Sequence, residues 1–179
     1  GTTGNAKGVM LSHRNFCHNV LEAWYAHKVY RRKDVFLSIL PLAHTYEMSI
    51  GMLYPLSTGC PVYYIQKPPT PTILSQALLK IRPTTILSVP LIIEKVIRGK
   101  IFPTIAGSKY LRYMKKHFPR ILYFLVGRKV KQQFGGRVRF FGIGGSKLDR
   151  EVEEFLRNIR FPYAIGYGLT ETAPLICDA

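Results

Sequence analysis

Short apolar runs rich in β-branched residues alternate with helix-periodic segments along most of the chain, and this alternation restricts the possible folds most strongly. Between the runs, apolar residues recur about every 3.6 positions, as Phe16, Val20 and Trp24 do, which indicates helices that bury one face. Strands that alternate with helices pair in parallel, so the sequence predicts an α/β fold, a doubly wound, mostly parallel sheet with helices on both faces. The runs that we interpret as strands are Val35–Leu40, Val62–Ile65, Thr85–Val89, Val138–Ile143 and Tyr163–Ile165.

Capping residues mark the expected helix starts. Ser12 precedes the first helical segment, and Asp149 precedes another whose first turn carries Glu151 and Glu153, where acidic side chains favour the helix dipole. A further helix is predicted to start near Thr72. The one long departure from regular alternation is residues 91–136, for which we expect a helical excursion with a basic surface, built from two helices joined near residues 102–107.

A length of 179 residues suits one domain. Position 1 lies in a Gly/Thr-rich loop and is not Met, so we expect residues 1–179 to be a single α/β subdomain truncated at both ends. The cysteines Cys17, Cys60 and Cys177 suit neither a disulfide framework nor a metal site, which favours a reducing, cytoplasmic compartment. Prolines, glycines and His44 interrupt the apolar stretch at residues 36–65, which favours a buried strand-helix-strand unit over a membrane span.

Positive charge is concentrated in one block. The net charge is +16, and residues 95–139 hold 13 Lys and Arg with no Asp or Glu. Such a block suits nucleic acid, an anionic membrane or phosphorylated ligands, and equally a solvated face that acidic segments of a longer polypeptide neutralise. No nucleic-acid recognition motif is present, so nucleic acid is not an expected partner.

One segment of this block has helical amphipathic spacing. Lys115, Lys116 and Arg120 fall opposite an apolar face, as on a helix that lies on a membrane surface. A helix packed against the rest of the protein explains the pattern equally well. The apolar positions are Leu111, Met114, Phe118, Leu122 and Leu125.

The chain opens with the glycine-spaced loop Gly1-Thr-Thr-Gly-Asn-Ala-Lys-Gly8. Such a loop exposes backbone N–H groups to phosphate oxygens, while Thr2 and Thr3 add hydroxyl donors and Lys7 offsets polyphosphate charge. The loop is not a Walker A motif, because no Gly-Lys-Ser/Thr follows Gly4. A phosphate cradle and an ordinary turn both remain open on these residues alone.

A second polar loop, Gly166-Tyr-Gly-Leu-Thr-Glu-Thr172, directly follows an apolar strand, where a doubly wound sheet presents ligands. Tyr167 offers a ring for stacking, Thr170 a hydroxyl for a phosphate, and Glu171 a hard oxygen ligand for Mg²⁺. The alternative is a polar loop with one structural glutamate.

Together, in this order, the two loops resemble those of the AMP-binding, adenylate-forming superfamily of acyl-CoA synthetases, luciferases and peptide-synthetase adenylation domains. The resemblance covers essentially the whole chain and is greatest to the long-chain fatty acid:CoA ligases. It continues through Leu11–Asn15, Leu40–Glu47, Val89-Pro90, Gly127–Val130 and Gly142–Ser146.

The resemblance implies a nucleotide site. Thr2, Thr3 and Lys7, together with Gly4, would contact the β- and γ-phosphates of ATP, although Ala6 replaces the usual proline of the family. Tyr167 would stack on adenine beside Gly168. Backbone along the adenine and acyl side would come from Gly144, Gly145 and Ser146, the last standing where long-chain ligases often have alanine.

The resemblance also implies catalytic positions. Thr170 and Glu171 would hold the α-phosphate and Mg²⁺, and His44 matches a position near the acyl carboxylate. A histidine satisfied in a helix-capping turn is the alternative for His44. In the implied reaction, a long-chain fatty acid and ATP form acyl-AMP and pyrophosphate. The CoA thiolate then displaces AMP to form the thioester, and no protein nucleophile is needed.

The family's ribose-binding Asp, its hinge and its catalytic Lys would lie after Ala179, so we expect residues 1–179 alone to be inactive. The expected partners are fatty acid, ATP, CoA and the remaining parts of the parent chain, with a peripheral position at the inner membrane surface. Two other functions are open: adenylation of an aryl or amino acid, and a non-catalytic basic module that binds membranes.

Overall fold

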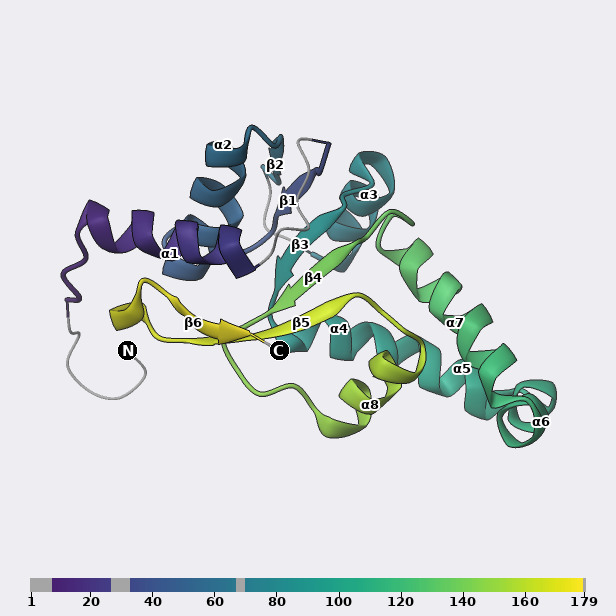
Figure 1. The fold of residues 1–179 in the computed structure, drawn as a ribbon. Coiled ribbons are helices and arrows are strands. Elements are labelled where there is room, and N and C mark those ends of the chain that lie inside the picture. Colours follow the sequence, from purple (N-terminus) through teal and green to yellow (C-terminus); the bar gives the residue numbers. More distant parts are fainter. Residues whose placement is uncertain (1–7, 27–32, 67–69, 179) are drawn as a thin grey trace.

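The computed structural model describes residues 8–26, 33–66 and 70–178, and a six-stranded sheet with the order β2-β1-β3-β4-β5-β6 lies at its centre (Figure 1). The strands from β2 to β5 are parallel, whereas β6 is antiparallel to β5. The predicted α/β fold is therefore confirmed, and each predicted run contains a strand. The strands are β1 (Phe36–Ser38), β2 (Val62–Tyr64), β3 (Thr85–Ser88), β4 (Phe140–Ile143), β5 (Tyr163–Gly168) and β6 (Leu175–Asp178).

Helices cover both faces of the sheet, because alternate residues of each buried strand point to opposite sides. On one face, Phe36 and Leu87 pack against α1 (His13–Ala26), the π-helical segment η1 (Glu47–Leu53) and α2 (Tyr54–Thr58). On the other, Leu37, Ile86 and Phe141 pack against α3 (Pro71–Ile81), α4 (Pro90–Val96), α7 (Pro119–Gln133) and α8 (Arg150–Asn158). Figure 1 shows the two groups of helices on either side of the strands.

Three helix starts follow the expected capping chemistry. The Ser12 hydroxyl accepts a hydrogen bond from Asn15 N at 3.2 Å, and an Asp149 carboxylate oxygen accepts one from Val152 N at 3.1 Å. Thr70 caps α3 in the same way, by accepting a hydrogen bond from Ile73 N. Side chains thus satisfy backbone donors that a helix leaves without partners in its first turn.

The helical excursion after β3 differs from the prediction in where it breaks. Residues 102–107, the expected joint, form α5 (Phe102–Gly107) directly after the π-helical segment η2 (Ile97–Ile101). Pro103 does not interrupt it: the backbone is helical at Ile101 and Phe102, and Phe102 N donates a hydrogen bond back to Ile97 O of η2. The chain instead turns at Ser108, whose hydroxyl caps α6 (Lys109–His117).

The single amphipathic helix expected over residues 111–125 is also wrong. Phe118 has φ −134° and ψ 55°, which separates α6 from α7. Pro119 explains the break, because a proline ring disfavours the helical conformation of the residue before it. Met114 and Leu122 are buried, whereas Phe118 and Leu125 are half exposed, so the expected apolar face is divided between packing and solvent.

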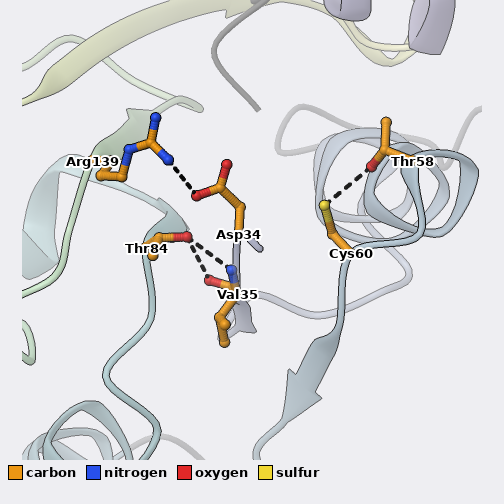
Figure 2. Close-up of polar contacts among 6 residues, drawn as sticks. All are labelled: Asp34, Val35, Thr58, Cys60, Thr84 and Arg139. Atoms are coloured by element: carbon orange, nitrogen blue, oxygen red, sulfur yellow. Dashed lines mark hydrogen bonds and ion pairs between the residues drawn. The ribbon is translucent and has the colours of Figure 1, made fainter. Parts of the chain in front are cut away.

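The amino ends of the central strands are fastened by polar contacts. Figure 2 shows Arg139, just before β4, directed at the buried carboxylate of Asp34, just before β1, at 3.1 Å. The Thr84 hydroxyl, just before β3, accepts a hydrogen bond from Val35 N at 2.8 Å. These contacts hold the amino edge of the sheet together. In sheets of this kind, ligands bind at the opposite, carboxyl edge. No helix among the described residues is long and apolar enough to cross a membrane.

Candidate functional site

A cavity of about 340 Å³ lies at the carboxyl edge of the sheet, among the segments that follow β1, β3, β4 and β5. Parallel strands end at this edge, so loops distant in the sequence meet there. The predicted site residues that line the cavity are His44, Gly144, Gly145, Tyr167, Gly168 and Thr170. The structure therefore brings these six together, while their individual roles stay predictions.

The other predicted site residues do not line this cavity. Ser146 and Glu171 are exposed beside it, each one residue beyond a lining residue. The first-loop residues Thr2, Thr3, Gly4 and Lys7 lie outside the described part of the chain.

Glycines at the end of β4 make room for Tyr46, a cavity residue that the sequence analysis missed. A Cβ on Gly142 would lie 2.6 Å from the Tyr46 hydroxyl oxygen, and one on Gly144 would lie 3.1 Å from its ring. Gly144 N also donates a hydrogen bond to Ser88 O at 3.0 Å, which extends the β3–β4 pairing to the cavity. Glycine inside a strand was the available signal, since it often marks the close approach of another group.

Hydrogen bonds of the Thr172 side chain hold the turn after β5. The Thr172 hydroxyl accepts a hydrogen bond from Leu169 N at 3.0 Å and donates one to Pro174 O at 2.6 Å. These bonds hold the short 3₁₀ segment η3 (Thr170–Thr172), so Thr170 and Glu171 lie on an ordered turn with exposed side chains. The predicted loop at residues 166–172 is wrong in its first half, because Gly166, Tyr167 and Gly168 belong to β5 and pair with β6. Tyr167 is 60% exposed, with its ring available to a ligand.

The wall of the cavity is completed by β6, which the sequence analysis did not predict. Leu175 and Pro174 line the cavity, and Leu175 O accepts a hydrogen bond from the Asn19 side chain of α1 at 2.7 Å. The Ser49 hydroxyl of η1 similarly donates a hydrogen bond to Ala173 O at 3.2 Å. Antiparallel pairing with β5 and these two long-range hydrogen bonds together place this segment.

His44 lies in a capping turn through its backbone, and its proposed place near an acyl carboxylate stays a prediction. Its backbone forms a capping turn, donating a hydrogen bond to Pro41 O and accepting one from Met48 N, each at 3.0 Å. Its side chain is exposed to the cavity and forms no hydrogen bond to another described residue. The backbone thus serves the turn, and the imidazole remains available to a ligand.

Glu47, next to Tyr46, is a buried carboxyl group that the sequence analysis did not single out. It is 1% exposed, and burial raises its pKa from 4.5 to about 7. The Ser38 hydroxyl opposes this rise, but neither carboxylate oxygen completes a hydrogen bond to another described residue. Gly51 admits the carboxyl group, because a Cβ there would lie 2.6 Å from one of its oxygens. A titratable core residue therefore directly follows Tyr46, which lines the cavity.

The described residues contain no group of three His, Cys, Asp or Glu side chains that would hold a metal ion by themselves. Glu171 offers one exposed carboxylate next to the Thr170 hydroxyl. This donor set suits Mg²⁺, which usually binds through one or two carboxylates together with substrate phosphates.

Sequence comparison identifies the family of this chain. The sequence profile of the family described as AMP-binding enzyme matches residues 1–179. The chain belongs to the AMP-binding enzyme family. Among curated members, it is 34% identical to peroxisomal long chain acyl-CoA synthetase 7 of Arabidopsis thaliana, over 98% of this chain and 27% of that protein. It is 32% identical to long-chain-fatty-acid–CoA ligase 1 of Saccharomyces cerevisiae, over 96% of this chain and 27% of that protein.

Solved structures of the AMP-binding type share the fold. The o-succinylbenzoate CoA synthetase of Bacillus subtilis, in complex with ATP and magnesium, superposes with a TM-score of 0.72 at 20% identity, over 100% of this chain and 30% of that one. A malonyl-CoA ligase with methylmalonyl-CoA and AMP bound gives 0.68 at 20% identity, over 99% and 33%. The chain therefore spans about a third or less of the length of these proteins, and at this identity the likeness concerns the fold alone.

Proposed function

We propose that this chain forms the nucleotide-handling part of a long-chain fatty acid:CoA ligase. The observation that carries the proposal is the meeting of His44, the Gly144–Gly145 turn and the Tyr167–Thr170 loop around one cavity. The similarity to long-chain acyl-CoA synthetases of a plant and a yeast supports the fatty acid as the carboxylate.

The cavity residues suit an adenine nucleotide. The exposed ring of Tyr167 stacks on the base, and the backbone of Gly144 and Gly145 lies along it without side chains to obstruct the approach. The Thr170 hydroxyl donates a hydrogen bond to the α-phosphate. Ser146, next to the cavity, continues this backbone along the adenine and acyl side, and Gly168 within the cavity lining keeps the backbone close to the nucleotide.

The phosphate chain is held by charge and hydrogen bonds. Glu171 provides one carboxylate oxygen for Mg²⁺, which when bound neutralises charge on the polyphosphate. Thr2, Thr3, Gly4 and Lys7 form the cradle for the β- and γ-phosphates, a role supported by their residue types and by the family profile over residues 1–179.

The reaction then depends on positioning. One oxygen of the fatty acid carboxylate, held near His44, attacks the α-phosphorus, and the bond from that phosphorus to the bridging oxygen breaks to release pyrophosphate. In the second step the CoA thiolate attacks the acyl carbon, and AMP leaves with the electron pair of the broken C–O bond. No side chain of this chain becomes covalently modified.

The test is pyrophosphate release from ATP by the natural polypeptide that contains this chain, across a panel of carboxylates. We expect the highest kcat/KM with long-chain fatty acids, followed by thioester formation when CoA is added. A preference for aryl or amino acids would contradict the proposed substrate but retain the reaction. Absence of pyrophosphate release with every carboxylate would contradict the reaction itself.

A further inference from the structure

The basic block at residues 95–139 divides into groups with different surroundings in the folded chain. Arg98 pairs with Asp149 at 2.7 Å and with Glu151 at 3.3 Å, which fastens the start of α8 to η2. Arg139 pairs with Asp34 at the amino edge of the sheet. These two arginines therefore have structural tasks inside the fold.

A second group lies beside acidic residues. A groove of about 640 Å³ between α5, α6 and α8 is lined by Arg112, Lys115 and Lys116, but also by Glu151 and Glu154. Opposite charges along the same groove reduce its net attraction for an external anion. Lys115 and Lys116, prominent in the sequence pattern, are therefore less suited to an anionic partner than their exposure suggests.

A third group has no acidic neighbour among the residues that line its groove. This groove of about 890 Å³ runs along α7 and the end of α8, and its charged lining residues are Arg120, Arg128, Lys131 and Arg160. None of the four forms an ion pair or side-chain hydrogen bond with another described residue. Three guanidinium groups without such partners offer paired donors of the geometry that phosphate oxygens accept.

An apolar stripe adjoins this basic groove. Ile121, Phe124 and Leu125 share the outward face of α7 by their helical spacing, and each is more than half exposed, as is Phe118 just before the helix. Phe124 also lines the basic groove, so the apolar and basic surfaces are continuous. Figure 1 shows α6 and the start of α7 at the end of the molecule farthest from α1 and the strands.

We propose that this α7 surface, defined by Phe118, Ile121, Phe124 and Leu125 with Arg120, Arg128, Lys131 and Arg160, docks on a membrane that contains anionic phospholipid. The apolar side chains would enter the boundary between headgroups and acyl chains, and the arginines would bind lipid phosphates. Charge complementarity favours this occupant, because the described lining of the groove has four cations and no acid.

Nucleic acid explains the surface less well. It would use the cations but give no reason for three aliphatic and aromatic side chains in a row on an exposed helix face. A membrane would contact both the apolar side chains and the cations of the α7 surface. Docking here would also leave the cavity at the carboxyl edge of the sheet separate from the contact, so membrane binding and ligase chemistry can be tested independently.

The test uses the natural polypeptide that contains this chain and compares two charge-matched triple variants. Arg120→Gln, Arg128→Gln and Lys131→Gln together remove charge from the basic groove. Arg112→Gln, Lys115→Gln and Lys116→Gln remove the same charge from the groove that also holds glutamates. Binding is measured by sedimentation with vesicles of phosphatidylcholine and phosphatidylserine and with vesicles of phosphatidylcholine alone, at low and physiological salt.

We expect the first triple variant to bind the phosphatidylserine vesicles roughly a hundredfold more weakly at low salt, and the second to lose less than about tenfold. Ile121→Ser with Leu125→Ser should weaken vesicle binding at both salt concentrations, since it removes apolar contacts with the membrane that do not depend on salt. Equal losses in the two triple variants, or a wild-type protein that binds neither vesicle, would overturn the proposal. Circular dichroism and pyrophosphate release confirm that each variant is folded.

Discussion

Among individual residues, Glu47 combines a titratable carboxyl group with nearly complete burial beside the candidate cavity. Because burial raises its pKa, the folded state holds its proton up to about pH 7, whereas the unfolded chain releases it near pH 4.5. The contribution of this group to the free energy of unfolding is therefore fully present below about pH 4.5, where the carboxyl group is protonated, and is lost as the pH rises through about 7.

Replacing Glu47 by Gln tests this linkage. The amide keeps the shape of the protonated carboxyl group but does not titrate, so the variant should gain stability relative to the wild type as the pH is raised. Between mildly acidic and mildly alkaline pH, the free energy of unfolding of the variant should rise by about 3 kcal/mol relative to that of the wild type, which is the energy equivalent of the pKa difference. Urea unfolding across that range measures it. A constant difference between the two proteins would mean that Glu47 is already charged in the fold.

Glu171→Gln is the matched substitution at an exposed carboxylate. Because Glu171 has no partner among the described residues, the variant should unfold at nearly the same urea concentration as the wild type. In the natural polypeptide it should lower the rate of pyrophosphate release by about a hundredfold at limiting Mg²⁺. Full activity under these conditions would contradict the assignment of Glu171 as a magnesium ligand.

At the level of elements, the end of β4 and the turn before η1 depend on each other. Gly142 and Gly144 lack the Cβ atoms that would collide with Tyr46, and Tyr46 forms part of the cavity wall. Small residues in the strand therefore determine where a large residue from another element lies.

Gly142→Ala should disturb this arrangement. Its Cβ would lie 2.6 Å from the Tyr46 hydroxyl oxygen and 2.8 Å from a Leu87 methyl group, so Tyr46 must move. We expect a loss of about 1–3 kcal/mol in the free energy of unfolding, and weaker AMP binding measured by calorimetry. Gly99→Ala is the control, because a Cβ at position 99 would meet no described atom within 4 Å. Equal AMP affinity in wild type and Gly142→Ala would show that Tyr46 does not shape the nucleotide site.

At the level of the whole molecule, residues 1–179 hold the loops around one cavity but span 27% of the length of the curated relatives. The described chain also has exposed apolar side chains along α1, such as Leu21 and Trp24, whose burial within it is incomplete.

We therefore expect residues 1–179 alone to form no measurable acyl-CoA. We propose this because the chain matches 27% of the length of its curated relatives, and the resemblance to long-chain ligases implies that the ribose-binding Asp and the catalytic Lys belong to the remaining length. A coupled assay with ATP, Mg²⁺, CoA and a long-chain fatty acid measures it, with the natural polypeptide as the positive control. A rate close to that of the control would show that this segment suffices for catalysis.

The sequence by itself determined the features that depend on local pattern. Alternating periodicities specify the parallel strands, and short polar side chains such as Ser12 and Asp149 specify helix starts, because these choices are made within a few residues. The same regularity placed Thr170 after a strand, and hence at the edge where the cavity lies, although the strand extends farther than predicted and includes Tyr167.

Only the tertiary structure decided the features that depend on distant partners. The segment before and within β6 bonds to η1 and α1 in addition to pairing with β5, and the burial of Glu47 follows from the packing of η1 on the sheet. Likewise, the sequence counts Lys115 and Arg128 as equal charges, whereas the fold sets Lys115 beside glutamates and Arg128 beside other cations. Charge and burial act through space, so a linear pattern identifies the residue types but not the neighbours that decide their effect.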